Sequence, residues 1–208
     1  MVADVASQPV RHRGHGVIRG VVEVPIIAVL AVLIVIVLRA VLVQPFYIPS
    51  ASMVPQLRIN DKILVSRLSY RFHQPRRGDI AVFDEPPGTQ VQGGQHHGGA
   101  VRFVTERLGL VPRTDELVKR VIALPGEQVE GKGGHVYVDG RLLLEPYLPP
   151  GVRTEPFPAR LVPAGMLWVM GDNRDDSEDS RIFGPIRGRT VVGRAVVRVW
   201  PLDAVAFL

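Results

Sequence analysis

The 208-residue chain contains no cysteine, which excludes both a disulfide framework and a thiolate metal site. Aromatic residues make up only 6% of the chain, and its 25 Lys and Arg residues form no continuous basic tract. This scatter argues against a nucleic-acid-binding surface, which would cluster basic and aromatic side chains. A net charge of +5 would equally suit a protein that lies close to anionic lipid headgroups.

Only one apolar run is long enough to cross a bilayer. Residues 24–43 are apolar except for Arg39, and twenty residues at helical rise span about 30 Å, the thickness of the bilayer core. We therefore expect one transmembrane helix at 24–43, after an N-terminal tail at 1–23. A cleavable signal peptide is the alternative, but no small-x-small cleavage site follows the run.

The charges before the apolar run predict its orientation. Three arginines against a single aspartate precede it, and the positive-inside rule then leaves the N-terminus in the cytoplasm. These residues are Arg11, Arg13, Arg19 and Asp4. We therefore expect residues 44–208 to form an extracytoplasmic domain at the cell membrane.

Residues after the apolar run predict a mainly β, antiparallel domain, because helical periodicity is nearly absent and short β-rich runs alternate with Gly and Pro. Asp139-Gly140 between two apolar arms is typical of a two-residue hairpin turn. The expected strands are 62–66, 80–83, 135–138, 167–170 and 191–200.

One stretch interrupts the β pattern. Residues 86–100 are rich in Gly, Gln, Pro and His and offer little to bury, so we expect a mobile surface loop. His96 and His97 lie in this loop, but no carboxylate stands at ligand spacing from them. We therefore expect neither a metal nor another cofactor.

Two serines directly follow the apolar run. Ser50 and Ser52 stand two positions apart, after Pro49 and before Met53 and Pro55. Ser52 is a candidate nucleophile, and Ser50 could help to stabilise an oxyanion formed when Ser52 attacks a carbonyl. A Ser/Pro turn leaving the membrane is the structural alternative.

Lys119 stands among strand-forming apolar residues, from Leu117 to Leu124. Burial lowers the pKa of a lysine, because the charged form loses its hydration. A neutral Lys119 could accept the proton of Ser52 and later return it to a leaving amine. The alternative is an ordinary solvent-facing lysine on a strand.

A dense polar run extends from Gly171 to Arg181. Its spacing does not fit an EF-hand calcium loop. We expect Asp179 and Arg181 to form an ion pair that orders the run, and Ser177 to orient the Lys119 amine.

Taken together, these blocks resemble type I signal peptidases, the membrane-bound Ser/Lys endopeptidases that remove signal peptides. The matching segments are the apolar run, 49–55, 78–83, 119–126 and 171–181. The resemblance implies a membrane helix followed by an antiparallel β catalytic domain of the signal peptidase type. It also implies a nucleophilic Ser52, a general base Lys119, an oxyanion contributor Ser50 and supporting roles for three residues. These are Ser177, Asp179 and Arg181.

The same resemblance implies cleavage after small residues at positions −1 and −3 of the substrate, through shallow apolar pockets. The residues that match pocket-lining positions are Phe46, Ile48, Met53, Leu57 and Val118. Implied partners are secretory preproteins, membrane lipid and the protein translocation machinery. The insertion at 86–114 departs from the family pattern, and the second β domain of the family should be small here.

Two alternatives differ in activity. One is a Ser/Lys peptidase with another role, such as an organellar processing enzyme or a self-cleaving repressor, although a repressor would need a DNA-binding module that the chain lacks. The other is an inactive, membrane-anchored protein that binds peptides. The presence of both Ser52 and Lys119 argues against it.

Overall fold

The computed structural model describes residues 25–32, 43–87 and 116–208. Residues 1–41 and 42–208 form two separate units. In the first unit, residues 25–32 are helical and exposed. Within the described ranges, no helix combines the length and apolar character needed to cross a membrane. Val43, the last residue of the expected anchor, is the first residue of a strand.

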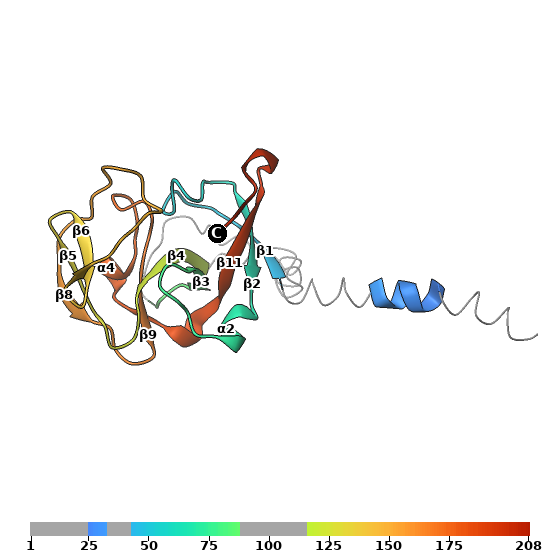
Figure 1. The fold of residues 1–208 in the computed structure, drawn as a ribbon, viewed down its shortest axis with the longest axis horizontal. Coiled ribbons are helices and arrows are strands. Elements are labelled where there is room, and N and C mark those ends of the chain that lie inside the picture. The colour runs from blue at the N-terminus through green and yellow to red at the C-terminus, as the bar shows by residue number, and fades with distance from the viewer. Residues whose placement is uncertain (1–24, 33–42, 88–115) are drawn as a thin grey trace, which may run out of the picture. The chain divides into compact units, whose positions relative to one another are not determined.

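The second unit is mainly β, as expected (Figure 1). Its larger sheet follows the order β1-β2-β11-β3-β4-β9-β10, with β12 paired to β11. All its pairs are antiparallel. The strands are β1 (Val43–Tyr47), β2 (Lys62–Ser66), β3 (Ile80–Asp84), β4 (Glu116–Ala123), β9 (Met166–Met170), β10 (Ile186–Arg187), β11 (Val191–Trp200) and β12 (Ala206–Phe207).

A second, four-stranded sheet follows the order β7-β6-β5-β8. Its strands are β5 (Gln128–Lys132), β6 (His135–Val138), β7 (Arg141–Leu142) and β8 (Phe157–Leu161). The predicted hairpin is present, since Val138 pairs with Arg141 across Asp139 and Gly140. Both turn residues have positive φ, 51° and 72°, as such a two-residue turn requires.

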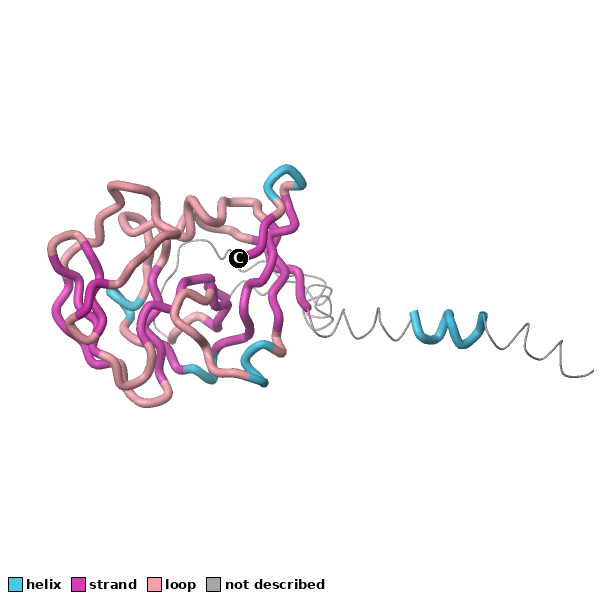
Figure 2. Tube along the Cα trace, viewed as in Figure 1, coloured by secondary structure: helices cyan, strands magenta, loops and turns pink. Residues whose placement is uncertain are grey.

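Helical segments are short, and loops make most of the connections in the second unit (Figure 2). They are α2 (Ser69–Phe72), α4 (Ser180–Phe183), η1 (Gly188–Thr190) and η2 (Leu202–Ala204). The predicted strands at 62–66, 135–138 and 191–200 match β2, β6 and β11, and those at 80–83 and 167–170 each gain one residue. Most of the predicted 86–100 loop lies outside the described residues.

Both faces of the larger sheet are buried. On β3, Ile80 and Val82 join one apolar cluster, whereas Ala81 and Phe83 join another. Because side chains alternate along a strand, these two clusters lie on opposite faces. Residues at the centre of this sheet are therefore shielded from water on either side, and a polar side chain placed there is strongly desolvated.

Candidate active site

Lys119 lies at the centre of the larger sheet, on β4, and its side chain is only 3% exposed. Its partner across the sheet is Ala81 on β3, and its neighbours on the same face of β4 are Leu117 and Val121. Ala81 and Val121 are fully buried in the apolar cluster on that face, against which Leu117 also packs. Lys119 is thus a cation-forming group within an apolar layer.

Burial lowers the pKa of Lys119 from 10.5 to about 8. Loss of hydration is the largest cause. The negative charges of Asp179, Glu178 and Asp176 act in the opposite direction, and the positive charge of Arg181 reinforces the lowering. At neutral pH a useful fraction of the amine is therefore uncharged.

Gly171 directly follows β9, the strand that pairs with the strand of Lys119. The β4–β9 pairing joins Val121 to Val169 and Arg120 to Met170. One further step in the same register would set Lys119 opposite Gly171, and both positions would then lie on the same face because side chains alternate.

Gly171 also touches two of the predicted serines. A β-carbon at this position would lie 2.4 Å from the Ser52 carbonyl oxygen and 2.2 Å from Ser177 Oγ. Gly171 does not have a positive φ, so it is the lack of space, and not the backbone conformation, that requires glycine here. Ser52 and Ser177 thus meet at Gly171, which directly follows the strand paired with the strand of Lys119.

The serine segment is not extended: residues 50–52 form a bend leading into a turn. Even so, Ser50 Oγ and Ser52 Oγ lie 3.2 Å apart, within hydrogen-bonding distance. The bend thus brings the two hydroxyls close together, as the proposed help of Ser50 to an oxyanion at Ser52 requires.

Asn173 holds the serine segment against the polar run. Its backbone N–H donates to the Ser52 carbonyl at 3.1 Å, and its side-chain amide donates to the Ala51 carbonyl at 3.2 Å. We did not predict this contact from sequence. The position of Asn173 in the polar run 171–181 was the only signal, and nothing in that pattern indicates a partner some 120 residues earlier.

The expected ion pair between Asp179 and Arg181 is present. Arg181 Nε donates to Asp179 Oδ1 at 2.9 Å, and Nη2 donates to Oδ2 at 2.8 Å. Asp179 also accepts from the Gly171 N–H at 3.0 Å, and Arg181 donates to the Arg174 carbonyl at 2.8 Å. The pair therefore links both ends of the polar run.

Two further arginines help to fix the run, Arg120 from outside it and Arg174 from within it. Arg120, beside Lys119 on β4, makes a two-point contact with Asp172 at 2.8 and 2.6 Å. Arg174 donates to the Gly171 carbonyl at 3.1 Å and pairs with Glu145 at 2.5 Å. Sequence reasoning missed these contacts, because 52 residues separate Arg120 from Asp172 and 29 separate Arg174 from Glu145.

The residues expected to line substrate pockets all belong to one buried cluster. Their exposed fractions lie between 0% and 7%, and Val118 and Phe46 are the most exposed of the five. A cavity of about 810 Å³ lies elsewhere on the domain, and none of the five lines it. Their role in specificity stays a prediction. They are Phe46, Ile48, Met53, Leu57 and Val118.

Among the described residues, no group of three or more histidines and carboxylates is placed to hold a metal ion. His96 and His97 lie outside those residues.

Comparison with known proteins identifies the family. The model of the family described as "Signal peptidase, peptidase S26" matches residues 21–200. The probable signal peptidase I-1 of a Synechocystis species is 40% identical over 181 residues, covering 86% of this chain and 82% of that protein. Signal peptidase I of Mycobacterium tuberculosis is 37% identical over 212 residues, covering 86% of this chain and 72% of that protein.

Among solved structures, a signal peptidase I of Enterococcus faecalis V583 matches with 29% identity and a TM-score of 0.42, covering 60% of this chain and 98% of that one. The family model spans most of the chain, and relatives well above 30% identity match along most of their own length. The chain therefore belongs to the signal peptidase family, peptidase S26, and is an enzyme of the signal peptidase I type.

Proposed function

We propose that the chain removes N-terminal signal peptides from secretory preproteins as a membrane-anchored serine endopeptidase, with Ser52 as nucleophile and Lys119 as general base. The observation that carries this proposal is the buried amine of Lys119, with a pKa lowered to about 8, next to the strand that leads into a glycine touching both Ser52 and Ser177. A lysine that only faces solvent would have neither feature.

In the proposed reaction, the neutral amine of Lys119 takes the proton of Ser52 Oγ as that oxygen attacks the scissile carbonyl. The Ser50 hydroxyl and the Ser52 backbone N–H donate to the resulting oxyanion. The ammonium of Lys119 then gives its proton to the leaving amine, and an ester links Ser52 to the signal peptide. Water, deprotonated by Lys119, hydrolyses that ester and restores Ser52.

Ser177 is proposed to orient the amine. Its Oγ is buried and has no hydrogen-bond partner among the described residues. A buried hydroxyl without a partner is costly, so a partner that forms the bond at some stage of the reaction is expected. The amine of Lys119, on the strand paired with the one that leads into Gly171, is the candidate that the arrangement offers.

Specificity for small residues at positions −1 and −3 is proposed to come from the apolar cluster below the serine segment. Met53 and Leu57 are 1% and 0% exposed, so the cluster has little room for a large side chain. Tight apolar pockets exclude bulky residues sterically.

We further propose a single-pass protein of the cell membrane, with residues 24–43 as the anchor and the catalytic domain outside the cytoplasm, where preproteins leave the translocation machinery. A reporter that is active only outside the cytoplasm should work when fused after Leu208 and fail when fused before Val21. The opposite pattern would exclude this topology.

The function is tested with the purified full chain in detergent and a preprotein that carries an Ala-x-Ala site. Cleavage should give one new N-terminus directly after that site, identified by sequencing. Ser52→Ala and Lys119→Arg should abolish cleavage, because a guanidinium stays protonated and cannot act as a base. The matched controls, Ser66→Ala and Lys132→Arg, should keep it.

Cleavage at another sequence would indicate a peptidase with a different role. Binding of the preprotein without cleavage by the wild-type chain would indicate an inactive peptide-binding protein. Activity in either purified Ser52 or Lys119 variant would exclude the proposed mechanism.

A further inference from the structure

The cavity of about 810 Å³ has a lining that differs in chemistry from the candidate active site. It lies between residues 70–75, which include most of α2, and residues 164–167 and 187–189, with Pro125 also in its wall. None of the residues assigned to catalysis lines it. A role separate from peptide cleavage therefore has to be considered.

The lining of this cavity is cationic. Three arginines and one histidine line it, and no aspartate or glutamate does. Within the described part of the chain, the three guanidinium groups make no hydrogen bond or ion pair, in contrast to Arg120, Arg174 and Arg181. The four residues are Arg71, His73, Arg187 and Arg189.

Unpaired guanidinium groups that surround one cavity suit a phosphate, because the planar fork of N–H donors matches phosphate oxygens. An aromatic side chain accompanies them. Phe72, directly after Arg71 in α2, is 82% exposed and is therefore available to an apolar partner. A ligand with a phosphate and an adjoining apolar part would contact both.

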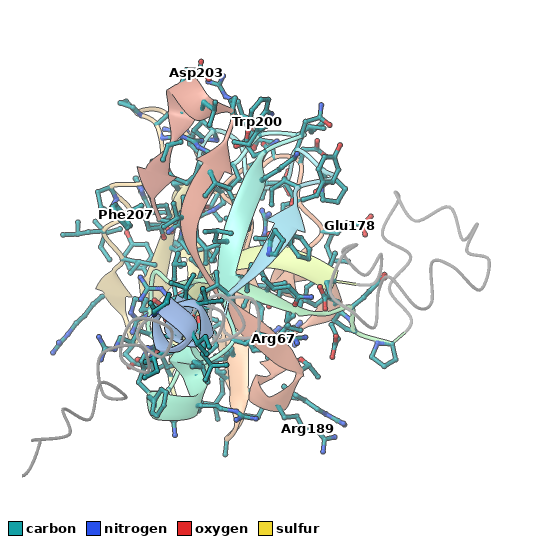
Figure 3. The ribbon with its side chains drawn as sticks, turned by 90° about the vertical axis from the view of Figure 1, so that its right-hand side faces the viewer. Arg67, Glu178, Arg189, Trp200, Asp203 and Phe207 are labelled. Carbon is teal, nitrogen blue, oxygen red and sulfur yellow. The ribbon has the colours of Figure 1, made fainter. Side chains whose placement is uncertain are left out.

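The position of the cavity within the domain also favours a lipid. Val43, where the apolar run ends, pairs with Ser66 at the end of β2, and α2 begins three residues later at Ser69. Figure 3 shows Arg189 at the end of the domain opposite Trp200, with Arg67 between them. The α2 side of the cavity thus directly follows β2, the strand that pairs with the first strand of the domain.

We propose that this cavity binds the phosphate of an anionic phospholipid headgroup, with Arg71, Arg187 and Arg189 as donors and Phe72 against the acyl region. A free phosphate shares the first part of this chemistry but would gain nothing from Phe72. The choice of a lipid rests on the proposed membrane anchor, since an anchored domain stays close to lipid headgroups.

The test uses the full chain in neutral detergent, with bound lipid counted by native mass spectrometry. The probes are short-chain phosphatidylglycerol, which is anionic, short-chain phosphatidylcholine, which is not, and inorganic phosphate. Arg187→Gln combined with Arg189→Gln should weaken phosphatidylglycerol binding by about tenfold or more, because hydrogen bonds to charged groups are the strong ones. Phosphatidylcholine binding should not change.

The control removes the same charge elsewhere: Arg141→Gln with Arg160→Gln, two exposed arginines of the second sheet. This pair should leave phosphatidylglycerol binding intact, and an equal loss would show that only net charge matters and would overturn the proposal. Phe72→Ala should weaken binding of the lipid but not of phosphate. If inorganic phosphate displaces the lipid at equal concentration and Phe72→Ala has no effect, the ligand is a free phosphate and the lipid proposal is wrong.

This outcome is separable from the proposed function. Lipid counting does not require peptidase activity, and the variant with both Arg187 and Arg189 replaced should still cleave a soluble preprotein in detergent. If the wild-type chain does not cleave the preprotein, the proposed function is refuted and the lipid site is not. Equal binding of both lipids by the wild-type chain would refute the lipid site alone.

Discussion

The charge state of Lys119 makes activity depend on pH in a way that the structure quantifies. With a pKa of about 8, about one amine in ten is neutral at pH 7. At the unperturbed value of 10.5 only about one in 3,000 would be neutral. Because only the neutral amine can accept the proton of Ser52, kcat/KM should rise about tenfold from pH 7 to a plateau above pH 9.

A single substitution tests whether Lys119 sets this rise of kcat/KM with pH, the acidic limb of the pH profile. The carboxylate of Glu178 is exposed and raises the pKa of Lys119 by charge attraction. Glu178→Gln should therefore lower that pKa and move the acidic limb to lower pH. The value of kcat/KM at pH 7 should increase, and the plateau should stay the same. Asp203→Asn, which removes an exposed carboxylate at the far end of the domain, should leave the limb in place (Figure 3).

The assay is cleavage of a fluorogenic signal-peptide substrate in detergent between pH 5.5 and 9.5, with kcat/KM measured at each pH. A shift to higher pH in Glu178→Gln, or an equal shift in Asp203→Asn, would refute the electrostatic reasoning. Replacing His96, His97 and His135 together should not affect the limb. Loss of the limb in that variant would mean that a histidine is the base and that the Lys119 assignment is wrong.

Three further substitutions test the geometry of the site. Gly171→Ala should lower kcat by about 10²-fold, because a β-carbon there displaces the Ser52 backbone, and small misplacements have costs of this size. Asn173→Ala should lower kcat more than it changes KM, and unfolding should become easier by about 1 kcal/mol through the lost bond to Ala51. Lys119→Met should abolish cleavage, yet raise the free energy of unfolding at pH 7 by up to about 3 kcal/mol, since the wild-type chain buries a mostly protonated amine. Urea titrations should show that this gain falls as pH rises from 8 to 10.5 and is lost above that range, where the amine is neutral in both folded and unfolded chains.

Much of the β architecture could be predicted because its signals are local. Alternating apolar residues between Gly and Pro predicted strands such as 191–200, with the bounds that the structure shows. Asp139-Gly140 indicated its hairpin because both residues tolerate positive φ. In contrast, β5 and β8 were not predicted, since β8 carries four exposed residues out of five and β5 contains a glycine. Long-range pairing, not local preference, makes these segments strands.

The candidate site divides in the same way. Ser52 and Lys119 could be selected from residue type and apolar surroundings, because desolvation of an amine follows from its neighbours along the strand. The need for glycine at position 171 could not be predicted from the sequence, because it arises from the close approach of a chain segment about 120 residues earlier. The contact between Arg174 and Glu145 has the same origin: it joins the polar run to the segment after the second sheet's hairpin.

The acidic run 171–181 poses an electrostatic problem, because carboxylates near Lys119 raise its pKa and oppose catalysis at neutral pH. The two buried carboxylates of the run, Asp172 and Asp179, are each held by an arginine at two points. Arg181 lowers the pKa of Lys119 where Asp179 raises it, so the charges of that pair partly cancel at the amine. Burial then remains the largest influence. Replacing an acidic residue of the run is therefore expected to lower the pKa of Lys119, and so to raise its neutral fraction, only where no arginine already offsets the charge of that residue. Exposed Glu178 is such a position.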